Sequence, residues 1–356
     1  MTDLNLPRVG ALGVGWIGAS RLAALSQSGQ AEIVGICDPN PEACEKARAC
    51  APSARIVQSY DELLALDLDA VVIATPSGLH AEQCLRAFDR GVAVFCQKPL
   101  TRSSEEAEAV LRAAQSSDRL LRVDFCYRQT QALSKLREVV QSGSLGRVYA
   151  VDLVFHNAYG PDKAWANDAN LAGGGCLIDL GVHLVDAAFW VLGAGHFERA
   201  HAQLFKQGQP LLPGALDVED FALGELETES SVNLRLACSW RSSFGTHARI
   251  RAEVFGTQGS ATFANVDGSF YDFSCDLHRG AHSERLVSPP DAWGDRAIVA
   301  FASELRESPR YRATDELLLV SRAIDALYGR RTVWASSPVR RARADSATGS
   351  VELNSP

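Results

Sequence analysis

The chain lacks the features that mark several large classes of protein. It has no CxxC pair, and its nine cysteines are an odd number scattered over 356 residues, which argues against a disulfide framework and for reduced thiols. The N-terminus MTDLNLPRVG has no basic start followed by an apolar stretch, so we do not expect a signal peptide. No uninterrupted apolar run approaches the roughly 18 residues needed to span a bilayer. These absences predict a cytoplasmic protein with no membrane partner.

An excess of positive charge is also missing. The formal net charge is -8 and the sequence pI is about 5.5, so phosphate backbones are not attracted non-specifically and we expect no nucleic-acid partner. The contents of hydrophobic residues (46%) and charged residues (22%) are those of soluble globular proteins. A length of 356 residues fits two domains better than one.

Short apolar runs alternate with helical patterns over residues 1–127. Runs without polar alternation are buried on both faces, which is typical of a parallel sheet covered by helices. The first 127 residues are therefore predicted to form a doubly wound α/β domain of the Rossmann type. The expected strands are Val9–Val14, Ile33–Cys37, Ala70–Ala74, Val92–Cys96 and Leu120–Phe125, and the expected helices are Ile17–Gln27, Glu42–Cys50, Leu79–Arg90 and Glu105–Ser116.

The pattern changes over residues 128–335. Longer segments with partial alternation predict a mostly antiparallel sheet with one face covered, hence an α+β domain. Residues 336–356 lack apolar periodicity and are expected to form a flexible tail. The expected strands are Val148–Phe155, Phe221–Leu226, Val232–Trp240, Ile250–Phe255 and Ser269–Cys275, and the expected helices are Leu177–Leu192, Arg296–Arg306 and Asp315–Tyr328.

A glycine motif, Gly13-x-Gly15-x-x-Gly18, follows the first predicted strand and opens the first predicted helix. In this context Gly13 permits a tight turn, Gly15 lets a pyrophosphate approach the backbone, and Gly18 allows close helix–strand packing. The helix N-terminus, with Trp16 and Ile17, offers free N–H groups to the anion. Asp38 ends the next strand about 20 residues later, where an acid binds the ribose hydroxyls and repels a 2′-phosphate. The sequence thus predicts NAD in preference to NADP. The alternative is an ordinary glycine turn and a strand-end aspartate.

Two further segments follow predicted strands, at the edge where an open α/β sheet binds its ligand. One is Ala74–His80, which contains Thr75, Pro76, Ser77 and His80, and the other is Gln97-Lys98-Pro99-Leu100. Lys98 lies between an apolar strand and a proline, a poor position for a solvated helix face. By spacing alone, a functional lysine and a strand-end lysine that reaches out to water are equally good interpretations.

Taken together, these residues resemble the Gfo/Idh/MocA family of oxidoreductases over most of the chain. The signatures are the glycine motif, ATPSGLH at Ala74–His80, QKPL at Gln97–Leu100 and GGGCLIDLGVHLVD at Gly173–Asp186. The resemblance implies a Rossmann domain followed by an α+β domain with a large open sheet that serves as the interface of a homodimer or homotetramer. It also implies hydride transfer between a nicotinamide and a hydroxyl or ketone of a sugar, cyclitol or related polyol.

The same resemblance implies that Lys98, Asp179 and His183 are catalytic. Histidine suits proton transfer near neutrality, Asp179 lies one helical turn before it and can orient it, and Lys98 can donate to the reacting oxygen. Without the family pattern, a helix cap is the favoured interpretation of Asp179 and a core histidine that of His183. The sequence departs from the family at Gln97, where the usual residue is glutamate; the amide can still bond ribose hydroxyls but carries no charge.

The expected substrate contacts end the first domain or precede the catalytic helix: Tyr127, Arg128, His156, Asn157 and Trp165, with Asp179 and His183. For each of these five, an ordinary loop or interface role is as good an interpretation. We expect no metal. Two rival functions stay open: a non-catalytic dinucleotide sensor of the same fold, and a metal-dependent hydrolase that uses Asp179, His183 and His156 but ignores the glycine motif.

Overall fold

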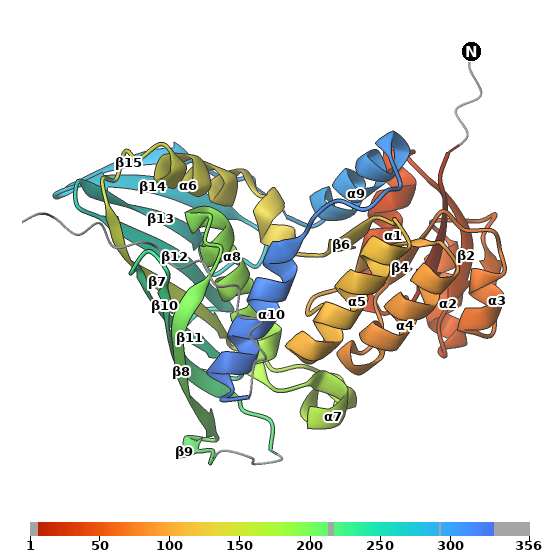
Figure 1. The fold of residues 1–356 in the computed structure, drawn as a ribbon, viewed down its shortest axis with the longest axis horizontal. Coiled ribbons are helices and arrows are strands. Elements are labelled where there is room, and N and C mark those ends of the chain that lie inside the picture. The colour runs from red at the N-terminus through yellow and green to blue at the C-terminus, as the bar shows by residue number, and fades with distance from the viewer. Residues whose placement is uncertain (1–5, 213–216, 292, 331–356) are drawn as a thin grey trace, which may run out of the picture.

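The computed structural model describes residues 6–212, 217–291 and 293–330, which form two sheets with their helices (Figure 1). The expected tail at residues 336–356 lies outside the described residues. Both predicted architectures are confirmed: a six-stranded parallel sheet at the N-terminus and a nine-stranded, mostly antiparallel sheet after it.

The first sheet has the strand order of a Rossmann fold, β3-β2-β1-β4-β5-β6, and every neighbouring pair is parallel. Its central strands are buried throughout, as expected when helices cover both faces. The order reverses between β1 and β4. Open α/β sheets bind their ligands outside the carboxyl ends of the strands at such a reversal, and we call this position the crevice. The strands are β1 (Arg8–Leu12), β2 (Glu32–Cys37), β3 (Arg55–Ile56), β4 (Ala70–Ile73), β5 (Ala93–Cys96) and β6 (Leu121–Val123).

The helices of this domain differ in how they begin. Side chains of Asn40, Ser59 and Ser103 accept backbone N–H bonds at the starts of α2 (Pro41–Arg48), α3 (Tyr60–Leu64) and α5 (Ser104–Ser116). No side chain caps α1 (Trp16–Ser28) or α4 (Ser77–Asp89), the two helices that follow β1 and β4. The helices flanking the crevice therefore begin with uncapped N–H groups.

The first domain is completed by a helix from near the end of the chain. Ile298 and Phe301 of α9 (Arg296–Glu307) join the core that contains Val9 and Leu22, and the rings of Phe95 and Phe301 are 5.4 Å apart. Figure 1 shows α9 beside α1. A boundary at residue 127 describes the sequence signals, but α9 lies beyond it and covers one face of the first sheet together with α1.

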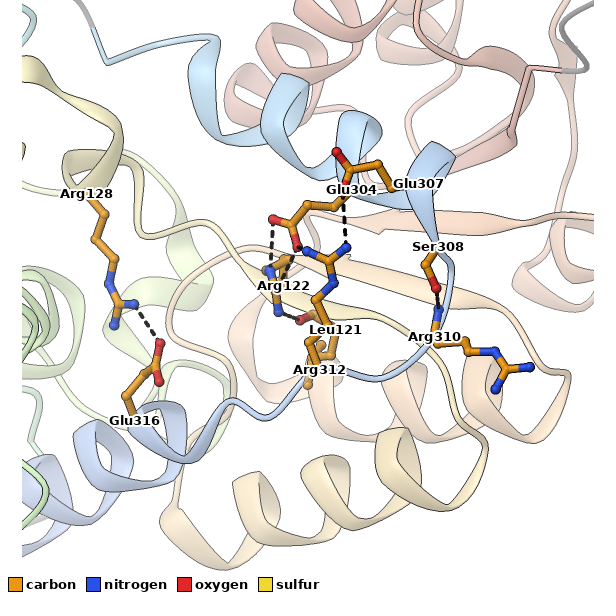
Figure 2. Close-up of polar contacts among 9 residues, drawn as sticks. All are labelled: Leu121, Arg122, Arg128, Glu304, Glu307, Ser308, Arg310, Arg312 and Glu316. Carbon is orange, nitrogen blue, oxygen red and sulfur yellow. Dashed lines mark hydrogen bonds and ion pairs between the residues drawn. The ribbon is translucent and has the colours of Figure 1, made fainter.

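Ion pairs hold this return of the chain in place (Figure 2). Glu304 of α9 accepts from Arg122 of β6 at 3.2 Å and from Arg312 at 3.3 Å. Farther along, Arg128 donates to Glu316 of α10 (Asp315–Leu327) at 3.0 Å. These contacts join α9 to the first sheet, and α10 to the turn that begins the second domain.

The second sheet is covered on one face only. Figure 1 shows α6 (Gln131–Gln141), α8 (Val182–Leu192) and α10 on one side, and in the described part of the chain no helix lies on the other. One pair, β7 with β11, is parallel. The strand order is β15-β14-β13-β12-β7-β11-β10-β8-β9, with β7 (Val148–Asn157), β8 (Phe197–Lys206), β9 (Gln209–Pro210), β10 (Phe221–Thr228), β11 (Asn233–Ser239), β12 (Ala248–Gly256), β13 (Gly259–Asn265), β14 (Phe273–Arg279) and β15 (His282–Val287).

Some elements were not predicted. The strand expected at Ser269–Cys275 begins at Phe273, and the sequence patterns missed β3, α3, α6, α7 (Ala169–Ala172), β8, β9, β13 and β15. The later start arises because the turn at Asp267-Gly268, both with positive φ, is closed by Val266 N donating to Asp272 O. One stretch, Ala169–Leu192, is long and apolar enough to cross a membrane, but 83% of its window is buried inside the fold, as befits a core helix.

Candidate active site

The glycine turn has the geometry that the motif predicts. Gly13 has φ +82° and donates its N–H to Cys37 O at 2.8 Å, and a Cβ at Gly18 would lie 2.1 Å from Gly13 O. Around Gly15, by contrast, a Cβ would meet within 4 Å only one described atom, Lys163 Nζ, at 3.3 Å. The backbone at Gly15 is thus open where uncapped α1 begins. This open backbone fits the pyrophosphate of a dinucleotide.

Asp38 is placed beside this turn. Its Oδ2 accepts from Val14 N at 2.7 Å and its Oδ1 from Asn40 N at 2.8 Å, so the carboxylate is held at the end of β2. The side chain remains partly exposed. Each carboxylate oxygen has a second lone pair available for a ribose hydroxyl.

The loop after β4 is tied to the loop after β5. His80 is buried, and its two ring nitrogens lie 2.9 Å from Thr75 O and Pro99 O. Burial lowers the pKa of His80. Both ring nitrogens face carbonyl oxygens of these loops, and the neutral ring has one N–H to donate to one of them. His80 therefore joins the two loops, and its expected contact with the cofactor stays a prediction. Thr75 and Pro76 are partly exposed, Ser77 is buried at the start of α4, Ile17 is partly buried, and Trp16 is 65% exposed at the start of α1.

A lysine of the first domain meets an aspartate of the second. Lys98 Nζ donates to Asp179 Oδ1 at 2.6 Å and to Asp179 O at 2.8 Å. The other carboxylate oxygen, Oδ2, accepts from Trp240 Nε1 at 3.0 Å. Asp179 lies in a π-helical turn, Leu177–Gly181, that precedes α8. Such turns are rare and occur frequently at functional sites.

His183 lies next to this pair but is not bonded to Asp179. Its side chain is buried against Tyr127, whose ring centre is 4.9 Å away, and against Phe155. Nδ1 has no hydrogen-bond partner among the described residues. Burial, and then the charge of Lys98, hold the pKa of His183 well below its usual value. No hydrogen bond joins Asp179 to His183, unlike the expected pair: the carboxylate oxygens accept from Lys98 and Trp240 instead.

Gln97, which stands where the family usually has glutamate, is bonded to a buried aspartate. Gln97 Nε2 donates to Asp124 Oδ2, and Arg21 Nε donates to the same oxygen at 2.6 Å. Arg21 and Asp124 are each only 1% exposed. This group is absent from the residues expected from the sequence, although an acid inside the apolar run Leu120–Phe125 was a usable signal. The carboxylate that the family usually has at position 97 is thus absent, and a carboxylate at position 124 lies beside the amide that replaces it.

The expected substrate residues are dispersed. Tyr127 packs against His183, and burial raises the pKa of its hydroxyl well above the usual value. The guanidinium of Arg128 donates to Asp186 at 2.9 Å and to Glu316, so its charge is already matched. Burial raises the pKa of Asp186 to about 6. Asn157 Oδ1 accepts from Tyr159 N at 2.8 Å, and Trp165 is partly buried in the 3-10 turn Ala164–Asn167.

His156 lies on the wrong face of the second sheet for substrate contact. Val151, Leu153 and Phe155 of β7 are buried under the helices, so His156 points to the helix-free face. There it bonds Ser239 Oγ at 2.8 Å and stacks on Phe221. A metal site of Asp179, His183 and His156 is not assembled, and within the described residues no cluster of three or more candidate ligands occurs.

A Rossmann domain with an open glycine turn, together with the half-buried Lys98–Asp179 pair at the end of β5, is typical of a dinucleotide-dependent oxidoreductase. Residues 7–125 match the model of the oxidoreductase family with an NAD-binding Rossmann fold, and residues 133–262 match the GFO/IDH/MocA C-terminal domain. The chain belongs to this family of enzymes.

Individual relatives are similar over most of the chain. A 1,5-anhydro-D-fructose reductase of Ensifer adhaerens is 30% identical, covering 73% of this chain and 76% of the relative. A D-xylose 1-dehydrogenase (NADP(+)) of Haloferax volcanii is 30% identical over 90% and 95% of the two chains. Among solved structures, a 3-ketoreductase from Actinomadura kijaniata with NADP and TDP-benzene is 25% identical with a TM-score of 0.78, over 91% and 98%. A levoglucosan dehydrogenase with NADH and levoglucosan has a TM-score of 0.77 at 22% identity, over 91% and 96%, which shows the shared fold.

Proposed function

We propose that the protein transfers a hydride between NAD(H) and a hydroxyl or ketone of a sugar, cyclitol or related polyol. The observation that carries the proposal is the Lys98–Asp179 contact of 2.6 Å, located where β5 ends at the crevice. Relatives named for glucoside, anhydrofructose and inositol substrates support a polyhydroxylated substrate.

Lys98, Asp179 and Trp240 have different roles at the reacting oxygen. A bound nicotinamide supplies the hydride acceptor or donor. Lys98 Nζ donates a hydrogen bond to the substrate oxygen and stabilises negative charge that develops there. Asp179 holds the ammonium in place from the side of the second domain, and Trp240 fixes the second oxygen of that carboxylate.

His183 is proposed to accept the proton of the alcohol. Because its pKa lies well below 6.5, the imidazole is neutral and able to accept a proton throughout the neutral range. The rate of alcohol oxidation should consequently fall with acid only as the pH drops below 6.5 toward that lowered pKa. A His183→Ala variant should lack this acid limb in a pH profile of kcat/KM.

Asp38 supports NAD over NADP. Its carboxylate is fixed by Val14 N and Asn40 N beside the glycine turn, where it would repel a 2′-phosphate. Replacing Asp38 by Ser and Asn40 by Arg together should raise NADPH use relative to NADH. Tighter binding of NADPH than NADH by the unmodified protein would contradict the assignment.

The helix-free face of the second sheet is proposed to pair with a second copy of the chain. It holds a hollow of about 480 Å³ lined by polar and apolar side chains, and Leu223 on it is 43% exposed. A Leu223→Glu variant should shift the mass measured by light scattering toward the monomer. An unchanged oligomer would place the interface elsewhere.

Absorbance of NADH at increasing concentrations of sugars, cyclitols and their ketones tests the proposed reaction. Turnover that disappears in Lys98→Met supports it. An unmodified protein that binds NADH but turns over none of these compounds would instead be a dinucleotide sensor.

A further inference from the structure

One segment of the second domain lies on the first. We call residues 158–172, which lie between β7 and the π-helical turn Leu177–Gly181, the crossover segment. It ends in a short helix, α7 (Ala169–Ala172), which Figure 1 shows beneath α4. A Cβ at Gly78 of α4 would lie 2.8 Å from Leu171 O, and Arg102 Nη1 donates to Asn170 O at 2.6 Å. The segment is therefore anchored at the uncapped start of α4.

The same segment places an amine at the glycine turn. Lys163 Nζ lies 3.3 Å from the position of a Cβ on Gly15, although the two residues are 148 positions apart in the chain. Lys163 is the residue before the 3-10 turn Ala164–Asn167, and it is exposed. The turn and the anchored α7 thus fix the backbone from which the side chain extends.

The charge of Lys163 is not matched by the protein. Across the described ranges, no carboxylate lies within 4 Å of its amine, and no hydrogen bond from it is formed. The glycine turn has no cation of its own, since residues 13–18 are GVGWIG. The first arginine of α1, Arg21, is buried against Asp124 and cannot reach solvent.

We propose that Lys163 binds the pyrophosphate of the dinucleotide from the second domain. The proposal rests on the function proposed above, because it takes that cofactor as the ligand. N–H groups at the start of α1 bind one side of such an anion, and the helix dipole contributes only about half a positive charge. A lysine ammonium adds a full charge and three donors on a flexible stem. Cofactor binding would then bridge the two domains.

Lys163→Ala should weaken NADH binding about tenfold, as expected for loss of one charge-assisted hydrogen bond to phosphate. Lys163→Glu should weaken it further, and Lys163→Arg should retain most of the affinity. Lys206 of β8 provides the matched control, because Lys206→Ala removes a lysine of the second domain that is remote in sequence from the crossover segment. Binding is measured by NADH fluorescence, with thermal unfolding to confirm that each variant is folded.

Competition against NADH identifies the part of the ligand that Lys163 contacts. Binding of ADP-ribose, which has the pyrophosphate but no nicotinamide, should weaken in Lys163→Ala as much as NADH does, whereas adenosine should be unaffected. The salt dependence of NADH binding should also become shallower in this variant, since one screened charge pair is lost.

Two results would overturn the assignment of Lys163. One is an NADH affinity of Lys163→Ala within about twofold of the unmodified protein, and the other is an equal loss for adenosine and ADP-ribose. Failure of the proposed function has a different signature, seen in the unmodified protein: it would bind neither NADH nor NADPH, or it would bind NADH and turn over none of the tested compounds.

Discussion

The two sheets present their functional residues in different ways. In the first sheet, the glycine turn, Asp38 and Lys98 all follow directly from strand ends, so their positions depend on local chain geometry. In the second domain, Asp179 lies in a π-helical turn and its neighbour Trp240 just after β11, 61 positions away. The cofactor half of the site is therefore built by local turns, and the substrate half by long-range packing.

Lys98 is where the two halves meet, and its replacement should have the largest effect. Lys98→Met should lower kcat by about 100-fold or more, the usual loss when a donor to a developing oxyanion is removed. NADH affinity should stay nearly unchanged, because the binding turn around Gly15 is separate. Steady-state rates and NADH titration measure both, and a variant with more than about a tenth of the original kcat would exclude Lys98 from the reaction.

Asp179 tests whether the carboxylate serves Lys98 or His183. Asp179→Asn keeps the shape but removes the charge that holds the ammonium, so kcat should fall roughly 10- to 100-fold. In double-mutant cycles this loss should be strongly non-additive with Lys98→Met and nearly additive with His183→Ala. The reverse pattern would restore the Asp179–His183 pair that the sequence suggested. A silent Asp179→Asn variant would reduce Asp179 to a helix cap.

Gln97 tests the buried group beneath the lysine. Gln97→Glu would bring a second carboxylate against Asp124, where burial and like charge together should lower the free energy of unfolding by about 2 kcal/mol at neutral pH. The pair would have a raised pKa when folded, so this penalty should shrink as the pH falls and one carboxyl takes up a proton. Thermal unfolding across pH measures the effect.

Adding Asp124→Asn to Gln97→Glu supplies the control. The new amide can donate to the new carboxylate, and Arg21 keeps a negative partner, so much of the lost stability should return. A double variant no more stable than Gln97→Glu would show that the amide at position 97 and the acid at position 124 are not a matched pair.

His156 should give the smallest effect on catalysis. Because its side chain lies on the helix-free face against Ser239 and Phe221, His156→Ala should change kcat and NADH affinity by less than about twofold. Steady-state kinetics of the variant in its native oligomeric state checks this. A large loss of turnover would mean that this face of the sheet contributes to the site after all.

Alternation along β7 held information that the sequence analysis did not use. In VDLVFHN the apolar Val151, Leu153 and Phe155 share one face, which places His156 on the other. Its position before the catalytic helix favours a substrate contact instead. The role of Arg128 could not be predicted from neighbouring residues, because its ion-pair partners Asp186 and Glu316 lie 58 and 188 positions away.

Local sequence patterns were enough to predict the Rossmann domain, the glycine turn and the place of Asp38, because each depends on hydrophobic period and on turn chemistry within a few residues. For Lys98 these patterns left a functional and a strand-end interpretation equally open. Packing between distant segments instead places Asp179 against Lys98, Asp124 against Gln97, α9 in the first core and Lys163 beside Gly15. These contacts join residues up to hundreds of positions apart. Their geometry is set by how whole helices and sheets pack, which no local pattern encodes.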